Sequence, residues 1–184
     1  MKKAYLFIAN GSEEVEALTV VDLLRRADVD VNIVSIEESA AIEGSNGIRI
    51  TADSLFADND YADADLVVLP GGLPGTLHLK GHEALGELLK AKAADDKTIV
   101  SAICAAPTVL GYHGILADKK ATCYPGCEGD LNAAQALTDK VVKDGQVITS
   151  RGIGTAIPFA LALIKELVDE AKSAEIAAGI VFTA

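Results

Sequence analysis

Residues 98–110, TIVSAICAAPTVL, join a buried strand to a helix through a single cysteine. Residues 98–103 carry no charge and are mostly β-branched or apolar, which is typical of a strand covered on both faces. From Ala105 onward the pattern favours a helix, because Pro107 is tolerated in a first turn, where its missing N–H has no partner to lose. Cys104 is therefore predicted at an abrupt strand-to-helix turn, the arrangement of a nucleophile elbow with sulfur in place of oxygen.

Two interpretations of Cys104 follow from this stretch, and both stay open. Backbone N–H groups and a helix N-terminus stabilise negative charge, which lowers the pKa of a cysteine and produces the nucleophilic thiolate. Most free cysteines, in contrast, are small buried apolar residues without a chemical role.

The rest of the chain alternates strand-like and helix-like segments with short links. Strands are predicted at residues 4–9, 29–35, 66–69 and 121–124, hairpins at 42–51 and 141–149, and helices at 13–27, 82–94, 105–110, 152–169 and 173–181, with a polar connector at 55–62. This order predicts an α/β fold in which a doubly wound parallel sheet carries hairpin additions. A length of 184 residues is consistent with one domain, spanning residues 1–184.

Three segments follow strand ends, where ligands bind in such sheets. Glu16 lies one turn inside the helix after the first strand, with Ser12 as the expected N-cap and the neighbouring glutamates as complements of the helix dipole. Gly71 and Gly72 lie in the loop PGGLPG, where backbone N–H groups can approach a ligand closely, as in an oxyanion hole. We therefore expect Glu16, Gly71, Gly72 and Cys104 to share one crevice.

The composition excludes several classes of function. A net charge of −11 argues against nucleic acid and against anionic membrane surfaces as partners. No stretch reaches the ~18 apolar residues of a membrane helix, and we see no signal-peptide pattern. Three cysteines do not form a disulfide framework, which favours a reduced, cytoplasmic compartment. Cys123 and Cys127 lack a second ligand pair, so no metal site is predicted.

Four ordered motifs carry a resemblance to a known family. They are NGSEEVE at 10–16, VLPGG at 68–72, AICAAP at 102–107 and TSRGIGT at 149–155. Together they resemble the ThiJ/PfpI family, in particular the branch of the Parkinson-disease-associated protein deglycase and YajL-type bacterial proteins. The resemblance covers essentially the whole chain. It implies a flavodoxin-like fold of the class I glutamine amidotransferase type, a homodimer and no cofactor.

The resemblance also implies roles for particular residues. Cys104 is expected to be an oxidation-sensitive nucleophile that is hydrogen-bonded to Glu16. Backbone N–H groups near Gly71, Gly72 and Ala105 are expected to bind an oxyanion.

Three further residues are candidates for the pocket. By the resemblance these are Tyr124, Arg26 and Gly152, although the spacing of Arg26 and Asp22 by itself favours a surface ion pair. Tyr124 stands where the deglycase branch often has a histidine, and a tyrosine with a pKa of about 10 is a poor base near neutrality. YajL-type relatives resemble this chain in having an aromatic residue there.

Two hypotheses of function follow. In the first, the chain is a slow enzyme of the glyoxalase III or protein deglycase type, a hydro-lyase or hydrolase. Its substrate is a small aldehyde or a glycated molecule; Cys104 forms a hemithioacetal and Glu16 shuttles protons. In the second, it is a redox-sensing or chaperone protein whose Cys104 is oxidised to sulfinate. A peptidase is disfavoured because Ala105 replaces the histidine of the protease-like branch, and a role in thiazole monophosphate biosynthesis has no support in the motifs.

Overall fold

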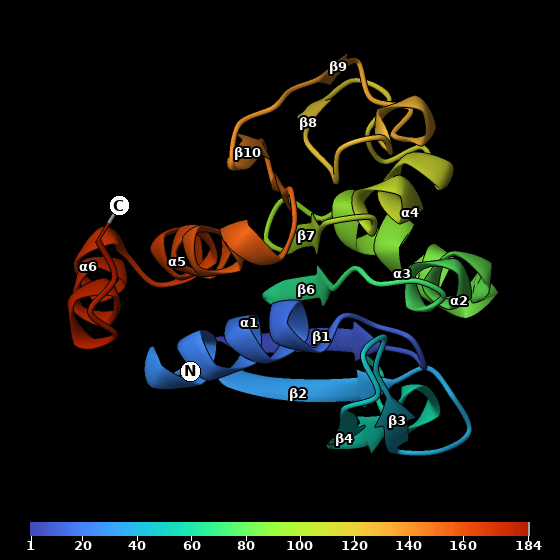
Figure 1. Ribbon diagram of the computed structural model, residues 1–184, viewed down its shortest axis with the longest axis horizontal. Helices are drawn as coiled ribbons and strands as arrows, with labels where there is room; N and C mark the ends of the chain where they lie inside the picture. Colours follow the sequence, from blue (N-terminus) through green and yellow to red (C-terminus); the bar gives the residue numbers. More distant parts are fainter. Residues whose placement is uncertain (184) are drawn as a thin grey trace.

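The computed structural model describes residues 1–183 and is built around a seven-stranded sheet in the order β10-β11-β7-β6-β1-β2-β5 (Figure 1). The strands are β1 (Lys3–Ile8), β2 (Asp30–Ser35), β5 (Ser54–Leu55), β6 (Leu66–Leu69), β7 (Ile99–Ile103), β10 (Val141–Asp144) and β11 (Val147–Ser150). Neighbouring strands pair in parallel, except that β10 and β11 form an antiparallel hairpin. The predicted α/β fold with a parallel sheet and hairpin additions is confirmed.

Helices cover both faces of the sheet (Figure 1). One face carries α1 (Glu14–Arg26), α5 (Ala156–Leu167) and α6 (Glu170–Gly179), and the other carries α2 (Gly75–Gly81), α3 (Glu83–Ala93) and α4 (Pro107–Tyr112). Alternate residues of β1 enter two separate cores: Leu6 and Ile8 pack toward α1, and Tyr5 and Phe7 pack on the opposite face. Because side chains of a strand alternate between faces, the uncharged run at residues 4–8 of β1 supplies both cores.

The strand order brings the candidate residues to one edge. The chain passes from β1 outward to β2, then returns to β6 and continues through β7 to β11 on the other side. The order therefore reverses between β1 and β6, and the crevice beyond the carboxyl ends at such a reversal is the usual ligand site of an open α/β sheet. Glu16, Gly71 and Cys104 follow β1, β6 and β7, respectively.

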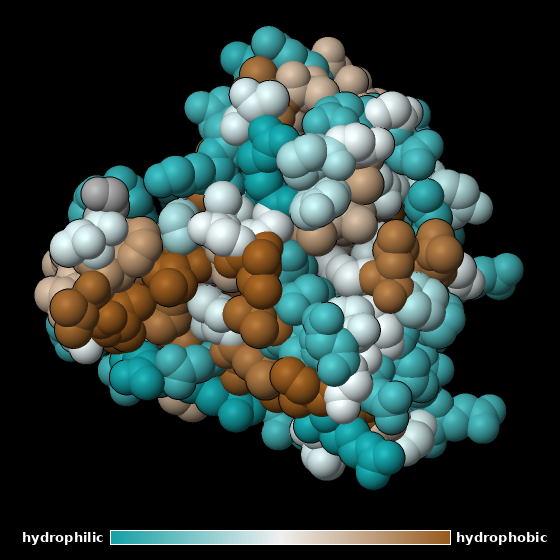
Figure 2. Space-filling model, in the orientation of Figure 1, coloured by the Kyte–Doolittle hydropathy of each residue, from teal (hydrophilic) through white to brown (hydrophobic). Residues whose placement is uncertain are grey.

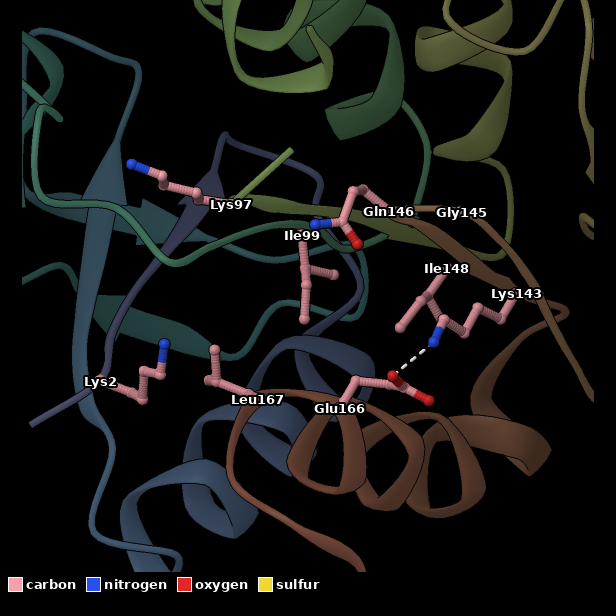
Figure 3. A pocket seen from close by; sticks show the side chains of 9 residues that line it. All are labelled: Lys2, Lys97, Ile99, Lys143, Gly145, Gln146, Ile148, Glu166 and Leu167. Atoms are coloured by element: carbon pink, nitrogen blue, oxygen red, sulfur yellow. Dashed lines mark hydrogen bonds and ion pairs between the residues drawn. The ribbon is translucent and has the colours of Figure 1, made fainter. Parts of the chain in front are cut away.

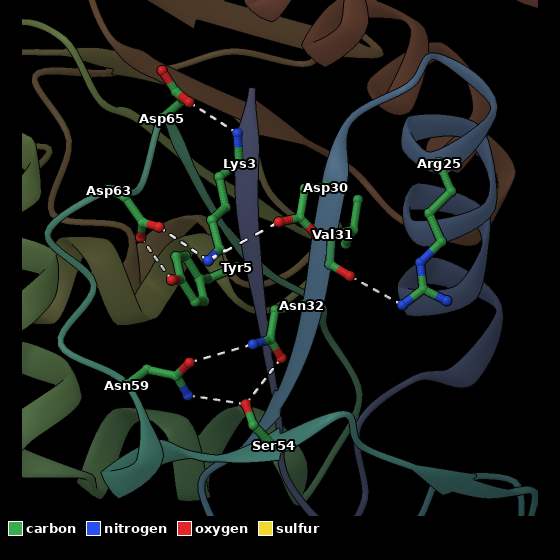
Figure 4. Close-up of polar contacts among 10 residues, drawn as sticks. All are labelled: Lys3, Tyr5, Arg25, Asp30, Val31, Asn32, Ser54, Asn59, Asp63 and Asp65. Atoms are coloured by element: carbon green, nitrogen blue, oxygen red, sulfur yellow. Dashed lines mark hydrogen bonds and ion pairs between the residues drawn. The ribbon is translucent and has the colours of Figure 1, made fainter. Parts of the chain in front are cut away.

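Several segments differ from the sequence-based expectation. The strand predicted at 121–124 is confined to Lys120–Ala121, and the helix predicted at 152–169 begins only at Ala156. Two further differences have an identifiable physical cause. The connector predicted at residues 55–62 instead begins with β5, which pairs with the end of β2, and continues into a 3₁₀ turn at Phe56–Asp58. Side-chain hydrogen bonds hold this edge: the Asn59 amide donates to Ser54 Oγ at 2.9 Å, and Ser54 Oγ donates to Asn32 Oδ1 at 2.9 Å (Figure 4). Such contacts between distant polar residues leave no periodic pattern in the sequence.

The second difference is α2, which the sequence did not predict. The helix begins at Gly75 directly after Pro74, so the sequence has the composition of a loop. A Cβ atom on Gly75 would lie 2.4 Å from the backbone nitrogen of Ser12, so this glycine serves close packing of α2 rather than a turn. At the other end His82 separates α2 from α3, and its Nδ1 accepts the Leu85 N–H at 3.0 Å.

Two small two-stranded sheets accompany the main sheet. β3 (Ala41–Glu43) and β4 (Arg49–Thr51) form the predicted antiparallel hairpin, and β8 (Lys120–Ala121) pairs in parallel with β9 (Gln135–Ala136) above α4 (Figure 1). The first is tied to α1 by Glu14, whose carboxylate accepts the N–H groups of Asn46 and Ile48 at 2.8 and 3.2 Å. Burial opposes ionisation of Glu14, but hydrogen bonds from Asn46 and Ile48 lower its pKa. Glu14 therefore binds the turn of the β3–β4 hairpin to α1, in addition to complementing the helix dipole.

Within residues 1–183, no helix combines the length and the apolar character that crossing a bilayer requires.

Candidate active site

Cys104 occupies the predicted turn between β7 and α4. Its φ of +66° is in the left-handed region, which a residue with a side chain adopts only when its surroundings impose it. Two backbone hydrogen bonds do so: the Cys104 N–H donates to the Ser150 carbonyl at 3.0 Å, and the Cys104 carbonyl accepts the Tyr124 N–H at 2.7 Å. The strained turn leaves the side chain partly exposed at the carboxyl edge of the sheet.

Glu16 reaches this turn from the first turn of α1, and it is 1 % exposed. The N-cap of α1 is Glu13, not Ser12 as predicted, and its carboxylate accepts the Glu16 N–H at 2.6 Å. Ser12 instead accepts the Ala9 N–H through its hydroxyl oxygen at 3.1 Å. Glutamate is not a usual N-cap residue whereas serine is, so residue preferences point to Ser12 and give no signal for Glu13.

Gly71 lies between the carboxylate and the thiol. Its N–H donates to Oε2 of Glu16 at 2.9 Å. A Cβ atom built on Gly71 would lie 2.5 Å from Cβ of Cys104, 2.8 Å from Oε2 of Glu16 and 2.9 Å from Sγ of Cys104. The absence of a side chain at this position is therefore what allows the three residues to meet, in the one crevice where the sequence predicted them.

The ionisation of the pair differs from the expectation of a lowered thiol pKa. Burial raises the pKa of Glu16 to about 7. Burial, and then the negative charge of Glu16 and its hydrogen bond, raise the pKa of Cys104 to about 12, against the backbone N–H groups of Ala105 and Gly72, which lower it. The helix behind the cysteine is also short, because α4 begins only at Pro107 and has 6 residues, so its dipole is weak.

These shifts describe two acids that share one proton. A thiolate beside an ionised Glu16 would place two negative charges together in a buried site, so the thiolate forms when the proton resides on Glu16. In that state the carboxylic acid can donate a hydrogen bond to sulfur.

Replacing Glu16 with glutamine should change how stability depends on pH. The folded-state pKa of Glu16, about 7, lies above its ordinary value of 4.5, so the folded protein holds a proton that the unfolded chain releases between these pH values. Stability of the wild type should therefore fall as pH rises through this window, by about 2–3 kcal/mol. The variant lacks this group, so its midpoint of thermal unfolding should decline less from pH 5 to pH 8. If the midpoint of thermal unfolding declines equally with pH in the two proteins, the raised pKa does not belong to Glu16.

Two of the three further pocket candidates border the site. Tyr124 is half exposed, and its ring lies beside Gly152, where an added Cβ would be 3.3 Å from Cδ2 of Tyr124 and 3.8 Å from Oε1 of Glu16. Arg26 does not reach the site. It lies 10 residues after Glu16 on α1, about 15 Å along the helix, and its exposed guanidinium donates to Asp22 at 2.6 Å.

The other two cysteines have different surroundings. Cys123 is 1 % exposed and packs in the core that faces α2–α4, where burial raises its pKa to about 12. Cys127 is partly buried against the same core. In the described part of the chain, no three His, Cys, Asp or Glu side chains come together in a way that could hold a metal ion.

A separate pocket lies at the opposite edge of the sheet, by the first residues of β7 and β11 (Figure 3). Its lysines include Lys2, which pairs with Asp65 at 2.8 Å, and Lys143, which pairs with Glu166. These ion pairs neutralise the two charges. The pocket is remote from the carboxyl ends of the strands and has no part in the candidate site.

Known proteins of one family share the sequence and the fold of this chain. The DJ-1/PfpI family matches residues 2–166. The chain is 39% identical over 181 residues to protein dj-1beta of Drosophila melanogaster, covering 97% of this chain and 96% of that protein. It is 34% identical over 158 residues to the Caenorhabditis elegans protein named glutathione-independent glyoxalase DJR-1.2, covering 85% of this chain and 83% of that protein.

Other relatives differ in length. The chain spans 41% and 45% of the length of the DJ-1 homologs B and A of Arabidopsis thaliana, to which it is 38% and 39% identical. Among solved structures, oxidized Toxoplasma gondii DJ-1 superimposes with a TM-score of 0.96 at 33% identity, with all of both chains covered. The fold, the motifs and these matches together show that this chain belongs to the DJ-1/PfpI family.

Proposed function

We propose that this chain is a cysteine-dependent enzyme that converts reactive carbonyl compounds without a cofactor, by glyoxalase- or deglycase-type chemistry. One observation carries the proposal: the Cys104 sulfur and the Glu16 carboxyl meet over the Gly71 backbone at a strained turn. The C. elegans relative named as a glyoxalase supports the same class of reaction.

The proposed reaction with methylglyoxal proceeds in three steps. Cys104 thiolate adds to the aldehyde carbon, and the oxygen takes up a proton to give a hemithioacetal, with the N–H groups of Gly72 and Ala105 stabilising the developing oxyanion. Glu16, now ionised, removes the proton from that carbon and returns it to the neighbouring carbon, while the hydroxyl proton moves to the neighbouring oxygen through an enediol, which leaves a thioester of lactate. Water then hydrolyses the thioester, releasing lactate and regenerating the thiol.

The direct test is product formation by the purified protein, with glutathione omitted. Incubation with methylglyoxal should yield lactate in many-fold molar excess over the protein. A single equivalent of covalent adduct at Cys104, with no free lactate, would rule out turnover.

A second candidate function is redox sensing or chaperone action, in which peroxide oxidises Cys104 to sulfinate. Two observations favour it: the Cys104 side chain is accessible at a strained turn, and a similar structure is that of an oxidized DJ-1. A peroxide titration followed by intact mass would show two added oxygen atoms on the wild type and none on Cys104→Ser. We further propose a cytoplasmic location, because all three cysteines are free thiols.

Replacing Tyr124 with histidine should raise kcat for methylglyoxal. Tyr124 borders the site and can donate a hydrogen bond, whereas a histidine at this position would titrate near neutral pH and could act as a base. General base catalysis is worth roughly 10²–10⁴-fold, and a replacement not optimised for the site should recover about tenfold. The rate of Cys104 alkylation should stay nearly unchanged. A slower Tyr124→His enzyme would show that Tyr124 itself works in catalysis.

The proposed oligomer is a homodimer that uses the outer face of α1. Val15 and Leu18 are 45% and 40% exposed, and Figure 2 shows apolar side chains gathered over α1 and toward α6. Val21, three residues after Leu18 on α1, is buried in the core of its own chain and is not part of this face. Light scattering at micromolar concentration should give twice the chain mass, and Leu18→Glu should give the monomer mass. A monomeric wild type would remove the proposal.

A further inference from the structure

The first turn of α1 uses an altered capping pattern. In a capping box, the glutamate at the third helical position folds back to the N–H of the N-cap residue. Here the N–H of the N-cap, Glu13, donates instead to the Gly71 carbonyl at 2.8 Å, and the side chain of Glu16 accepts the Gly71 N–H at 2.9 Å. The Gly71 backbone thus takes the place of a direct contact between the Glu16 side chain and the Glu13 N–H. This arrangement frees the Glu16 carboxyl from its own helix and directs it toward Cys104.

The same contact orients the oxyanion donor. The carbonyl of Gly71 and the N–H of Gly72 belong to one planar peptide unit and point in opposite directions. Because the Glu13 N–H holds the carbonyl, the Gly72 N–H is oriented away from α1, and this N–H lowers the pKa of the Cys104 thiol. Gly72 has a φ of +91°, and an added Cβ would lie 2.3 Å from the Glu13 nitrogen. The first turn of α1 and the backbone of Gly71 and Gly72 therefore pack together as one unit.

The Glu13 side chain adds a negative charge to this unit. Its carboxylate is partly buried and lies 2.6 Å from the Glu16 N–H, at the base of the Glu16 side chain. We propose that Glu13 is a positioning residue for the Glu16–Cys104 pair: its charge keeps the shared proton on Glu16 and so leaves the thiolate on Cys104. This inference rests on the thiolate chemistry of the proposed function.

The effect requires that Glu13 act more strongly on Glu16 than on the thiol. After burial, the negative charge of Glu13 raises the pKa of Glu16 further, whereas the charge that raises the pKa of Cys104 is that of Glu16. Among the described residues, the titratable groups that face Glu16 are Glu13 on its own helix, Cys104 after β7 and Tyr124 across Gly152. Glu13 is the member of this set whose charge opposes the Glu16 carboxylate without taking part in the shared proton.

The test is the pH profile of Cys104 alkylation by iodoacetamide in Glu13→Gln, measured by peptide mass spectrometry. Glutamine keeps an oxygen that accepts the Glu16 N–H, so the cap survives while the charge is removed. Loss of the charge should make Glu16 ionise more readily. The alkaline plateau of the rate should then fall roughly three- to tenfold, and the midpoint of the profile should move to lower pH by about half to one unit. On the acid limb Glu16 is protonated in both proteins, so the rates there should coincide.

The matched control is Asp22→Asn, which removes an exposed carboxylate from the same helix. It should leave the whole profile unchanged. Coincident profiles for wild type and Glu13→Gln would overturn the proposal, and so would an equal effect of Asp22→Asn. A uniform drop at every pH, the acid limb included, would show a purely structural role and would also overturn it. Failure of the proposed function would give a different result: the wild type would form no lactate although its alkylation profile is as predicted.

Discussion

Replacing Cys104 with serine should lower methylglyoxal turnover by at least about 10³-fold, to the background rate. The hydroxyl of serine remains protonated in this site, because Glu16 has a pKa of about 7 and is far too weak a base to ionise an alcohol. Serine also lacks the polarisable sulfur that adds readily to an aldehyde at neutral pH. The measurement is steady-state lactate formation, with circular dichroism to show that the variant is folded.

The other two thiols supply the matched controls. Cys123→Ser removes a buried thiol and should lower stability with little effect on kcat, because Cys123 packs in the core facing α2–α4. Cys127→Ser should leave both nearly unchanged. Turnover that persists in Cys104→Ser, or that disappears in Cys127→Ser, would show that Cys104 is not the nucleophile.

Gly71→Ala should lower kcat/KM by roughly 10²-fold while the protein still folds. The added methyl would lie within 3 Å of Cβ and Sγ of Cys104 and of Oε2 of Glu16, so the pair must separate to admit it. Misplacement of reacting groups by about 1 Å costs on the order of 10²-fold in rate. Overpacking at one site typically costs about 1–3 kcal/mol of stability, which a domain of this size tolerates.

A second glycine on this side of the sheet serves as the control for Gly71→Ala. An added Cβ at Gly154 would meet no atom within 4 Å, so Gly154→Ala should retain activity and stability. Full activity in Gly71→Ala would mean that Glu16 and Cys104 need not approach across this glycine, and the proton-sharing account would be wrong.

The fold could be predicted because its signals are local and strong. Uncharged apolar runs such as residues 66–69 and 98–103 form the central strands β6 and β7, and their burial on both faces leaves no alternative. The glycine-rich turns marked both hairpins correctly. Two of the elements that the sequence did not predict, α2 and β5, depend on packing against Ser12 and on side-chain hydrogen bonds to β2, contacts that only the folded chain creates.

The sequence predicted where the candidate site lies, but it did not predict the pKa of the Cys104 thiol. The rule that ligands bind at strand ends brought Glu16, Gly71 and Cys104 together, and the structure has them in contact. Arg26 was placed near the pocket by resemblance alone, and helix geometry puts it about three turns away, beside Asp22. The thiol pKa could not be predicted, because desolvation and the charge of Glu16 outweigh a 6-residue helix, and burial is a property of the fold.

The central claim is that Cys104 becomes a thiolate near neutral pH because Glu16 takes the shared proton. The most direct test is a pH titration of the ultraviolet thiolate absorbance, taken as the difference between wild type and Cys104→Ser. The pair releases its first proton near pH 7, the pKa to which burial raises Glu16, and the account predicts that the molecules keeping the remaining proton on Glu16 give a thiolate signal that rises with this midpoint. A difference signal that is absent at pH 8 and develops only toward pH 12, the raised pKa of a Cys104 facing an ionised Glu16, would contradict it.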